Sequence, residues 1–349
     1  MKKLLMLVTV LMLSVCALPL ATLSLEPEMP PQPASAGADA VSETEREEEP
    51  QPAESEMRRR SYDRRTCITL CRGGDTVELS LYDYLSGVLA AEMPANFPEE
   101  ALKAQALAAR TYTLYKLMLY DNGAEIPPEH NGAQMCDDYH HCKAFCDIAA
   151  AREEKWGADA DYYEARVRSA VEATDGLVAI CEGEPIAAVF HAASGSLTES
   201  AEDVWGAELP YLTSVESPGG EASPNYSAEV RVKQADFAER VLEKYPQAVL
   251  DIPASEWFKD SHRSEAGGVI DVLVGGVRVK GSFVREIAGL NSTNFRVSPT
   301  EEELIFTTTG YGHCVGMSQY GARELALEGK TFDEIIRHYF TGVELMLKT

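Results

Sequence analysis

Residues 84–112, YLSGVLAAEMPANFPEEALKAQALAARTY, contain the pattern that decides the fold. Leu85, Val88 and Leu89 recur at helical spacing, and Pro94 ends that helix. Pro98 with the two acidic residues after it opens a second helix, because proline and negative charge both favour a first turn. The second helix is rich in alanine as far as about residue 119, so the two helices are expected to pack closely.

Short strands and further helices surround this helix pair. Four short runs have the composition of β-strands: 67–70, 76–79, 176–181 and 186–192. Three stretches have helical periodicity: 167–173, 234–244 and 318–328. Gly73-Gly74 predicts a hairpin between the first two strands, and Thr331 begins a capping box for a last helix through Tyr339. The predicted class is α+β, with helices and short antiparallel strands in two lobes around a substrate cleft.

The N-terminal residues 1–25 have the features of an export segment. Two lysines precede an uncharged stretch, which is typical of a secretory signal peptide or of one membrane span with its basic end in the cytoplasm. We expect an uncleaved cell-membrane anchor and an extracytoplasmic domain; cleavage would make the protein secreted. Residues 26–56, rich in Pro and Glu, predict a solvated acidic linker, and residues 57–349 the folded domain.

The chain is acidic, with 56 Asp and Glu against 31 Lys and Arg and a formal net charge of −25. Binding to nucleic acid needs concentrated Lys and Arg against the phosphates, so this balance argues against a nucleic-acid partner. A neutral or cationic ligand, such as a glycan, is compatible with it.

Glu92 is a candidate acid in an unusual setting. A glutamate is most often a solvated surface residue, and that interpretation applies to any single Glu. Here, however, Leu, Ala and Met residues surround the carboxyl group, and the C-terminal end of the helix carries partial negative charge. Both effects disfavour the carboxylate and raise its pKa, which suits a general acid that works near neutral pH.

Three stretches resemble one known family: residues 84–112, residues 190–215, FHAASGSLTESAEDVWGAELPYLTSV, and residues 310–343, GYGHCVGMSQYGARELALEGKTFDEIIRHYFTGV. From about residue 66 to the C-terminus the chain is similar to stage II sporulation protein D, a cell-wall enzyme family related to amidase-enhancer proteins. The resemblance implies that the folded domain is a lytic transglycosylase of peptidoglycan and that Glu92 is its acid/base. It also implies work in forespore engulfment, with a wall amidase and membrane proteins as partners.

A lytic transglycosylase needs one such carboxylate, whereas an ordinary glycosidase uses two. The acid protonates the glycosidic oxygen between MurNAc and GlcNAc. The same residue then acts as a base and helps the C6 hydroxyl of MurNAc attack its own anomeric carbon, which gives a 1,6-anhydro sugar. The resemblance implies glycan strands already stripped of stem peptides as the preferred substrate.

Several polar or aromatic residues are candidates for contact with the glycan: Arg110, His191, Ser194, Tyr211, His313, Ser318 and Gln319. Arg110 could instead be a buried arginine paired with a carboxylate, Ser194 a turn residue, and Tyr211 part of the core. The polar residues of the glycine-rich loop that begins at Gly310 could instead face water. Three further candidates of the same kind are Gln105, Glu199 and Trp205.

Cysteines and histidines crowd one loop: His130, Cys136, His140, His141, Cys142 and Cys146. Four such ligands suit tetrahedral zinc, although the spacing is not that of a standard finger. A similar cluster in clostridial-type members of the family favours a zinc site made by His130, Cys136, His141 and Cys142, with His140 or Cys146 able to replace one. We expect the metal to order this loop beside the cleft. A disulfide between Cys136 and Cys146 is the alternative.

Two other functions fit parts of the pattern. A non-catalytic module that binds glycan and stimulates a wall amidase fits the resemblance to amidase enhancers. A zinc-dependent peptidase or amidase fits the cysteine and histidine cluster, but the sequence contains no HExxH pattern. A serine hydrolase is disfavoured because Ser194 lacks the nucleophile-elbow pattern. The presence of Glu92 favours the transglycosylase.

Overall fold

The computed structural model describes residues 61–138 and 142–349. The predicted anchor (residues 1–25), the predicted linker (residues 26–56), and His140 and His141 lie outside the described residues. Within the described ranges, no helix is both long enough and apolar enough to cross a membrane.

Two hydrophobic cores lie within the described residues. The first draws on two separate segments, from Ile68 to Leu212 and again from Val315 to Val343. The second contains residues between Val232 and Phe306. The second core is therefore an insertion in the chain of the first.

The part of the chain that carries the first core has these elements before the insertion, where η marks a short 3-10 helix or, for η2, a π-helix: α3 (Tyr62–Arg65), β1 (Cys67–Arg72), β2 (Asp75–Ser80), α4 (Leu81–Glu92), α5 (Glu99–Asp121), η1 (Pro128–His130), β3 (Met135–Cys136), α6 (Ile148–Ala151), η2 (Arg152–Trp156), η3 (Gly157–Asp159), α7 (Ala160–Ala173), β4 (Leu177–Cys181), β5 (Glu184–Pro185), β6 (Phe190–His191), α8 (Ala201–Trp205) and η4 (Gly220–Ala222). After the insertion come β13 (Met317–Ser318), α11 (Gln319–Leu327), α12 (Phe332–Tyr339) and β14 (Glu344–Leu347).

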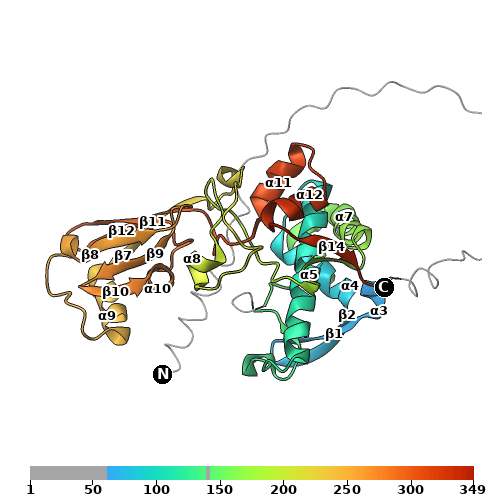
Figure 1. Ribbon diagram of the computed structural model, residues 1–349, viewed down its shortest axis with the longest axis horizontal. Helices are drawn as coiled ribbons and strands as arrows, with labels where there is room; N and C mark the ends of the chain where they lie inside the picture. Colours follow the sequence, from blue (N-terminus) through green and yellow to red (C-terminus); the bar gives the residue numbers. More distant parts are fainter. Residues whose placement is uncertain (1–60, 139–141) are drawn as a thin grey trace, which may run out of the picture. The chain divides into compact units, whose positions relative to one another are not determined.

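The predicted helix pair is confirmed as α4 and α5. The Ser80 hydroxyl caps α4 by accepting a hydrogen bond from the Asp83 N–H, and the helix ends two residues before Pro94. Proline blocks continuation because the residue before it is pushed out of the helical conformation. Helix α5 is lined by fully buried alanines and contacts α4, α7, α11 and α12 (Figure 1). It is the central helix of the first core.

Three small sheets complete the first core. Strands β1 and β2 form the predicted hairpin, and β3 adds to β1 in parallel. Strands β14 and β5 pair with β4 from either side. Strands β6 and β13 form a short parallel pair that joins residues far apart in the sequence. This last pair brings the second and third of the sequence stretches quoted above side by side.

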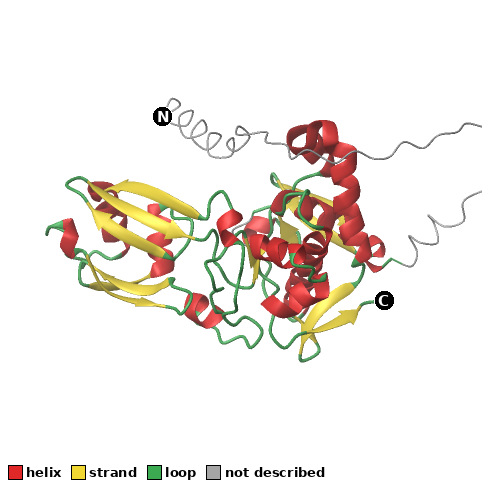
Figure 2. Ribbon diagram, turned by 90° about the horizontal axis from the view of Figure 1, so that it is seen from above, coloured by secondary structure: helices red, strands yellow, loops and turns green. Residues whose placement is uncertain are grey.

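The insertion contains two three-stranded sheets, two α-helices and one 3-10 helix: β7 (Ser227–Lys233), α9 (Gln234–Lys244), η5 (Ala254–Glu256), β8 (Phe258–Arg263), β9 (Val269–Val274), β10 (Val277–Lys280), α10 (Gly281–Ala288), β11 (Phe295–Pro299) and β12 (Glu303–Thr309). Figures 1 and 2 show these elements gathered in one group. Phe237 packs against Trp257 and Phe306 at its centre. Its two ends meet, because the N–H of Gly310 donates a 2.7 Å hydrogen bond to the carbonyl oxygen of Tyr226.

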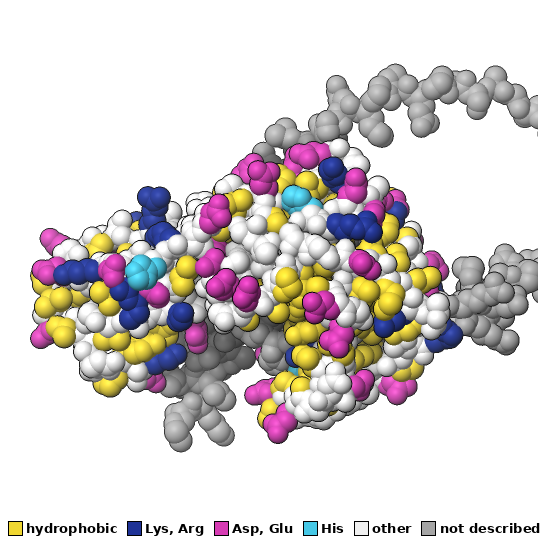
Figure 3. Space-filling view, in the orientation of Figure 1, with side chains coloured by type: hydrophobic (Ala, Val, Ile, Leu, Met, Phe, Trp, Pro, Cys, Tyr) yellow, Lys and Arg dark blue, Asp and Glu magenta, His cyan; other side chains and the backbone are white. Residues whose placement is uncertain are grey.

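Most predicted elements are confirmed, including the helix over 234–244 and the capping box at Thr331. The predicted strand over 186–192 is wrong. Glu184 and Pro185 pair with β4, residues 186–189 belong to no strand, and only Phe190 and His191 form a strand, with β13. The α+β class is correct, whereas the cleft between two lobes stays a prediction. On the face drawn in Figure 3, basic side chains lie interspersed with acidic ones.

Candidate active site

Glu92 is the last residue of α4, and its carboxyl group is tied to two distant parts of the chain. The backbone N–H of Ala144 donates a 3.0 Å hydrogen bond to Oε1. The side-chain amide of Gln319, at the start of α11, donates a longer bond of 3.5 Å to Oε2. The fold therefore brings together the first and third of the stretches quoted from the sequence.

Burial raises the pKa of Glu92 above its ordinary value of 4.5. The positive charge of Lys143 and the hydrogen bonds from Ala144 and Gln319 oppose this rise, because all three favour the carboxylate. The direction agrees with the sequence-based expectation. Its cause is the burial of the group, which the apolar neighbours in the sequence had suggested.

Lys143 is a buried lysine that the sequence analysis did not single out. Its ammonium lies 4.2 Å from the ring centroid of Tyr112 and 3.9 Å from that of Phe190. Burial lowers its pKa to about 8, although the negative charge of Glu92 raises it. A cation held between two aromatic faces next to a carboxyl group can stabilise negative charge that develops there.

The segment that follows Cys142 is pressed against α4. Gly87 leaves room for the ring of Phe145, since a β-carbon at Gly87 would lie 2.2 Å from that ring. The N–H of Cys146 donates to the Gly87 carbonyl oxygen at 3.2 Å, and Phe145 stacks on Tyr84. These contacts hold the backbone N–H of Ala144 against Glu92.

His191 and His313 lie next to each other, with ring centroids 5.6 Å apart. Nδ1 of His191 bonds to the carbonyl oxygen of Val315, and Nδ1 of His313 accepts from the N–H of the same residue, both at 3.1 Å. Burial lowers the pKa of His191 to about 4 and that of His313 well below its ordinary value. Both rings are therefore neutral at neutral pH.

The glycine-rich loop lies against the segment that leads into β6. Gly316 has φ +73°, and a β-carbon there would lie 2.3 Å from the carbonyl oxygen of Val189. Gly312 has φ +117°, and a β-carbon there would lie 2.7 Å from Cβ of His191. Glycine is needed at both positions because it tolerates positive φ and allows this close approach.

Three predicted contact residues have structural roles. The hydroxyl of Ser194 donates to that of Ser217 at 2.8 Å. The hydroxyl of Tyr211 accepts from the N–H of Ala187 at 3.3 Å. Ser318 caps α11, since its hydroxyl accepts from the N–H of Gly321 at 3.1 Å. Each side chain is buried. Contact of these residues with a glycan stays a prediction.

Arg110 is fully buried and forms an ion pair of 2.6 Å with Asp63, which is also fully buried. Its guanidinium also donates to the Thr174 hydroxyl and to the carbonyl oxygens of Val171 and Leu177. Of the two interpretations of Arg110, the structure has the arginine paired with a carboxylate. Arg110 is therefore a residue of the core, and its contact with a glycan stays a prediction.

Gln105 and Glu199 are also buried. Among the described residues, neither polar atom of the Gln105 side chain has a hydrogen-bond partner. Glu199 accepts a 3.0 Å hydrogen bond from the N–H of Gly268, in the insertion. Glu199 thus connects the loop before α8 to the insertion.

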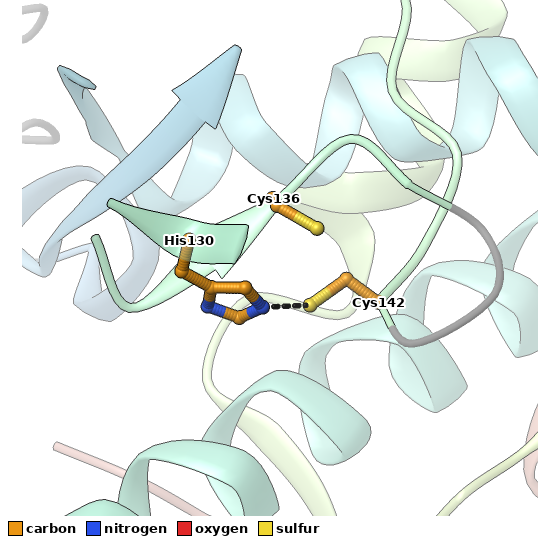
Figure 4. Close-up of side chains that lie close together, drawn as sticks. All are labelled: His130, Cys136 and Cys142. Carbon is orange, nitrogen blue, oxygen red and sulfur yellow. Dashed lines mark hydrogen bonds between the residues drawn. The ribbon is translucent and has the colours of Figure 1, made fainter. Parts of the chain in front are cut away.

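The proposed zinc ligands that the structure describes are His130, Cys136 and Cys142, and they point toward one another (Figure 4). Their ligand atoms all lie within 4.8 Å of one another, and all three residues are buried. Nε2 of His130 is 3.3 Å from Sγ of Cys142, while Nδ1 is 3.1 Å from the carbonyl oxygen of Ala133. When a carbonyl oxygen accepts a hydrogen bond from one ring nitrogen of a histidine, the other ring nitrogen is left as the metal ligand, as in many metal sites.

None of the seven cysteines in the described ranges forms a disulfide. The alternative prediction, a disulfide between Cys136 and Cys146, is therefore wrong. Cys142 directly precedes Lys143 and Ala144, and the N–H of Ala144 bonds to Glu92, so the described end of this loop lies against Glu92. This adjacency in the sequence was the one signal that could have drawn attention to Lys143. That a metal orders the loop beside a cleft stays a prediction.

A family model described as "Stage II sporulation protein" matches residues 74–180. Stage II sporulation protein D of Bacillus subtilis (strain 168) is 36% identical over 267 residues, which cover 76% of this chain and 74% of that protein. The protein of the same name from Bacillus amyloliquefaciens is 35% identical over 269 residues, with the same shares of each chain. The protein "Amidase enhancer" of Bacillus subtilis (strain 168) is 26% identical over 309 residues, which cover 75% of this chain and 40% of that protein.

Proposed function

The chain belongs to the stage II sporulation protein D family, and on this basis we propose that it is a lytic transglycosylase of peptidoglycan. It would cleave the MurNAc–GlcNAc bonds of glycan strands, preferably strands stripped of stem peptides, and leave 1,6-anhydro-MurNAc ends. It would act in remodelling of the septal wall during engulfment. The observation that carries the proposal is the partly buried Glu92 carboxyl group, hydrogen-bonded by Ala144 and Gln319, with its raised pKa.

The contacts of Glu92 suit both halves of the reaction. Ala144 holds Oε1 at 3.0 Å, whereas Oε2 accepts only the longer 3.5 Å bond from Gln319, so Oε2 can carry the proton that goes to the glycosidic oxygen as the bond breaks. Once the proton has left, Lys143 and the two N–H donors stabilise the carboxylate. The carboxylate then accepts the proton of the C6 hydroxyl as that oxygen attacks the anomeric carbon. The proton returns to Glu92, and no water is consumed.

The direct test uses purified full-length protein and two substrates, glycan strands with and without stem peptides. Products are analysed by mass spectrometry for 1,6-anhydro-MurNAc ends. We expect these ends mainly from the stripped strands. Hydrolysis to reducing MurNAc ends instead would identify an ordinary glycosidase and refute the proposed mechanism.

A second candidate function is supported by the similarity to the amidase enhancer. In this alternative the protein binds glycan without cleaving it and stimulates a wall amidase. A wall amidase and membrane proteins would be partners under either function. The two functions differ in one product: only the transglycosylase leaves anhydro ends.

The activity is expected to fall as pH rises through the pKa of Glu92, because the general acid must be protonated. Burial raises this pKa, so the protonated acid persists to higher pH than an exposed Glu allows. The midpoint of the alkaline limb of kcat/KM should therefore lie above 4.5. In Lys143→Met the pKa of Glu92 should rise further, because the positive charge that favours its carboxylate is gone, and the alkaline limb should move to still higher pH. The exposed Lys330→Met is the control, and a limb that moves to lower pH would contradict the assignment.

We propose that His130, Cys136 and Cys142 bind zinc together with a further ligand, for which His141 is our prediction. Two thiolates and an imidazole are donors that zinc prefers, and the observed positions of their ligand atoms fit one ion. Bound there, zinc would cross-link the loop to the rest of the first core. It would thereby stabilise the segment that carries Lys143 and Ala144.

Zinc removal tests this site. We expect about one zinc per chain by elemental analysis, since a tetrahedral centre holds one ion. Cys142→Ser should lower the zinc content and the thermal unfolding temperature, because metal-binding free energy contributes to folding. The exposed Cys67→Ser should change neither. Equal zinc content in both variants would show that the metal, if bound, is held elsewhere.

We propose that residues 1–25 anchor the protein in the cell membrane and that residues 26–56 link this anchor to an extracytoplasmic domain. Glycan strands of the wall would then lie within reach of the active site.

A further inference from the structure

Trp205 differs from the other two tryptophans of the chain in its exposure. Trp156 and Trp257 are 9% and 4% exposed, whereas Trp205 is 48% exposed. A single exposed apolar side chain is common and means little by itself. What distinguishes Trp205 is its position next to the glycine-rich loop of the candidate active site.

The short helix α8 holds Trp205 in a fixed position. Ser200 caps the helix, and Gly206, in a left-handed conformation, ends it directly after Trp205. The N–H of Glu199, just before the cap, donates a 2.7 Å hydrogen bond to the carbonyl oxygen of Cys314. The segment that leads into α8 is thus hydrogen-bonded to the glycine-rich loop.

The indole is the outer member of a row of three rings. Its centroid lies 5.5 Å from that of His313, which lies 5.6 Å from that of His191. His191 directly follows Phe190, whose ring faces the ammonium of Lys143. Lys143 in turn interacts with Glu92. The positive charge of Lys143 also acts on His313, the middle ring of the row, so the row lies near the lysine that interacts with the candidate acid.

We propose that Trp205 stacks on a pyranose ring of the glycan strand and forms a sugar-binding subsite of this active site. A pyranose has an apolar C–H face that an aromatic ring can cover, while the indole N–H can donate to a hydroxyl. The two imidazoles behind the indole are neutral because burial lowers the pKa of each. An uncharged wall suits an uncharged pyranose such as the GlcNAc unit of the strand. The proposal rests on the proposed function, which makes a glycan strand the substrate.

The exposure difference supplies a test that does not depend on turnover. Acrylamide quenches exposed tryptophans, so Trp205 should account for most quenching of the full-length protein. Stripped glycan strands should protect it in the Glu92→Gln background, in which the strand is not consumed. In Trp205→Ala the strand should bind roughly three- to tenfold more weakly. Trp205→Phe, which keeps an aromatic face, should restore most of the affinity while abolishing the protectable fluorescence.

The matched control is Tyr162→Ala, which removes an aromatic side chain of α7 that is 59% exposed. It should bind the strand as the wild type does, and thermal unfolding should show that all variants are folded. The subsite is refuted if Trp205→Ala binds the strand as tightly as the wild type and the strand leaves quenching unchanged. If the wild type makes no anhydro ends but the strand still protects Trp205, the transglycosylase proposal fails and the subsite stands.

Discussion

Replacement of Glu92 by Gln is expected to lower the rate of 1,6-anhydro-MurNAc formation by roughly 10²- to 10⁴-fold, the usual contribution of a general acid–base group. Glutamine keeps the shape of the side chain and an oxygen that can accept from the N–H of Ala144. It has no proton that it can transfer. The rate should therefore fall while the fold and glycan binding remain, which mass spectrometry and thermal unfolding can check together.

A matched control is Glu184→Gln at the exposed first residue of β5, which should leave the rate unchanged. Retention of most of the activity in Glu92→Gln would exclude Glu92 as the acid. If neither the wild type nor the variant makes anhydro ends, but both stimulate a wall amidase equally, the enhancer function takes the place of the enzyme.

The second large effect concerns stability. Arg110→Ala should lower the free energy of unfolding by about 3–5 kcal/mol, because it leaves the Asp63 carboxyl group buried without its partner. Burial raises the pKa of Asp63 even with Arg110 present. A loss of this size is a large part of the stability of an ordinary domain. Urea unfolding followed by circular dichroism would measure it.

Two further variants separate a structural from a substrate-binding role. Arg64→Ala removes a partly exposed ion pair with Glu172 and should cost no more than about 1 kcal/mol. The double change Asp63→Leu with Arg110→Met should recover part of the stability, since it removes both buried charges. Normal stability of Arg110→Ala with weakened glycan binding would instead restore the substrate-contact interpretation.

The sequence predicted those features that local rules specify. Proline, capping residues and helical periodicity located α4, α5 and α12 because each signal acts within a few residues. The burial of Glu92 could also be anticipated, since Leu89 and Met93 lie beside it in the sequence. The strand predicted over 186–192 was wrong because strand pairing depends on a distant partner. Here Met317 and Ser318 pair with only two residues of that run.

The surroundings of the acid could not be predicted for the same reason. Ala144 contributes a backbone N–H, which any residue type supplies, so no sequence pattern marks it. The position of Lys143 depends on the packing of Phe145 against Gly87 and on rings from two other elements. The carboxylate that pairs with Arg110 belongs to Asp63, 47 positions earlier in the chain. Such contacts exist only after the core has formed.

The insertion starts and finishes at one place, where Tyr226 and Gly310 share a hydrogen bond. A segment whose ends meet can grow, shrink or be exchanged during evolution without diverting the chain on either side of it. Selection could therefore adapt this part to a new partner while Glu92 and the three rings described above stay unchanged. The hydrogen bond from Gly268 to Glu199 is a contact through which a change in the insertion would still alter the position of α8, the helix that carries Trp205.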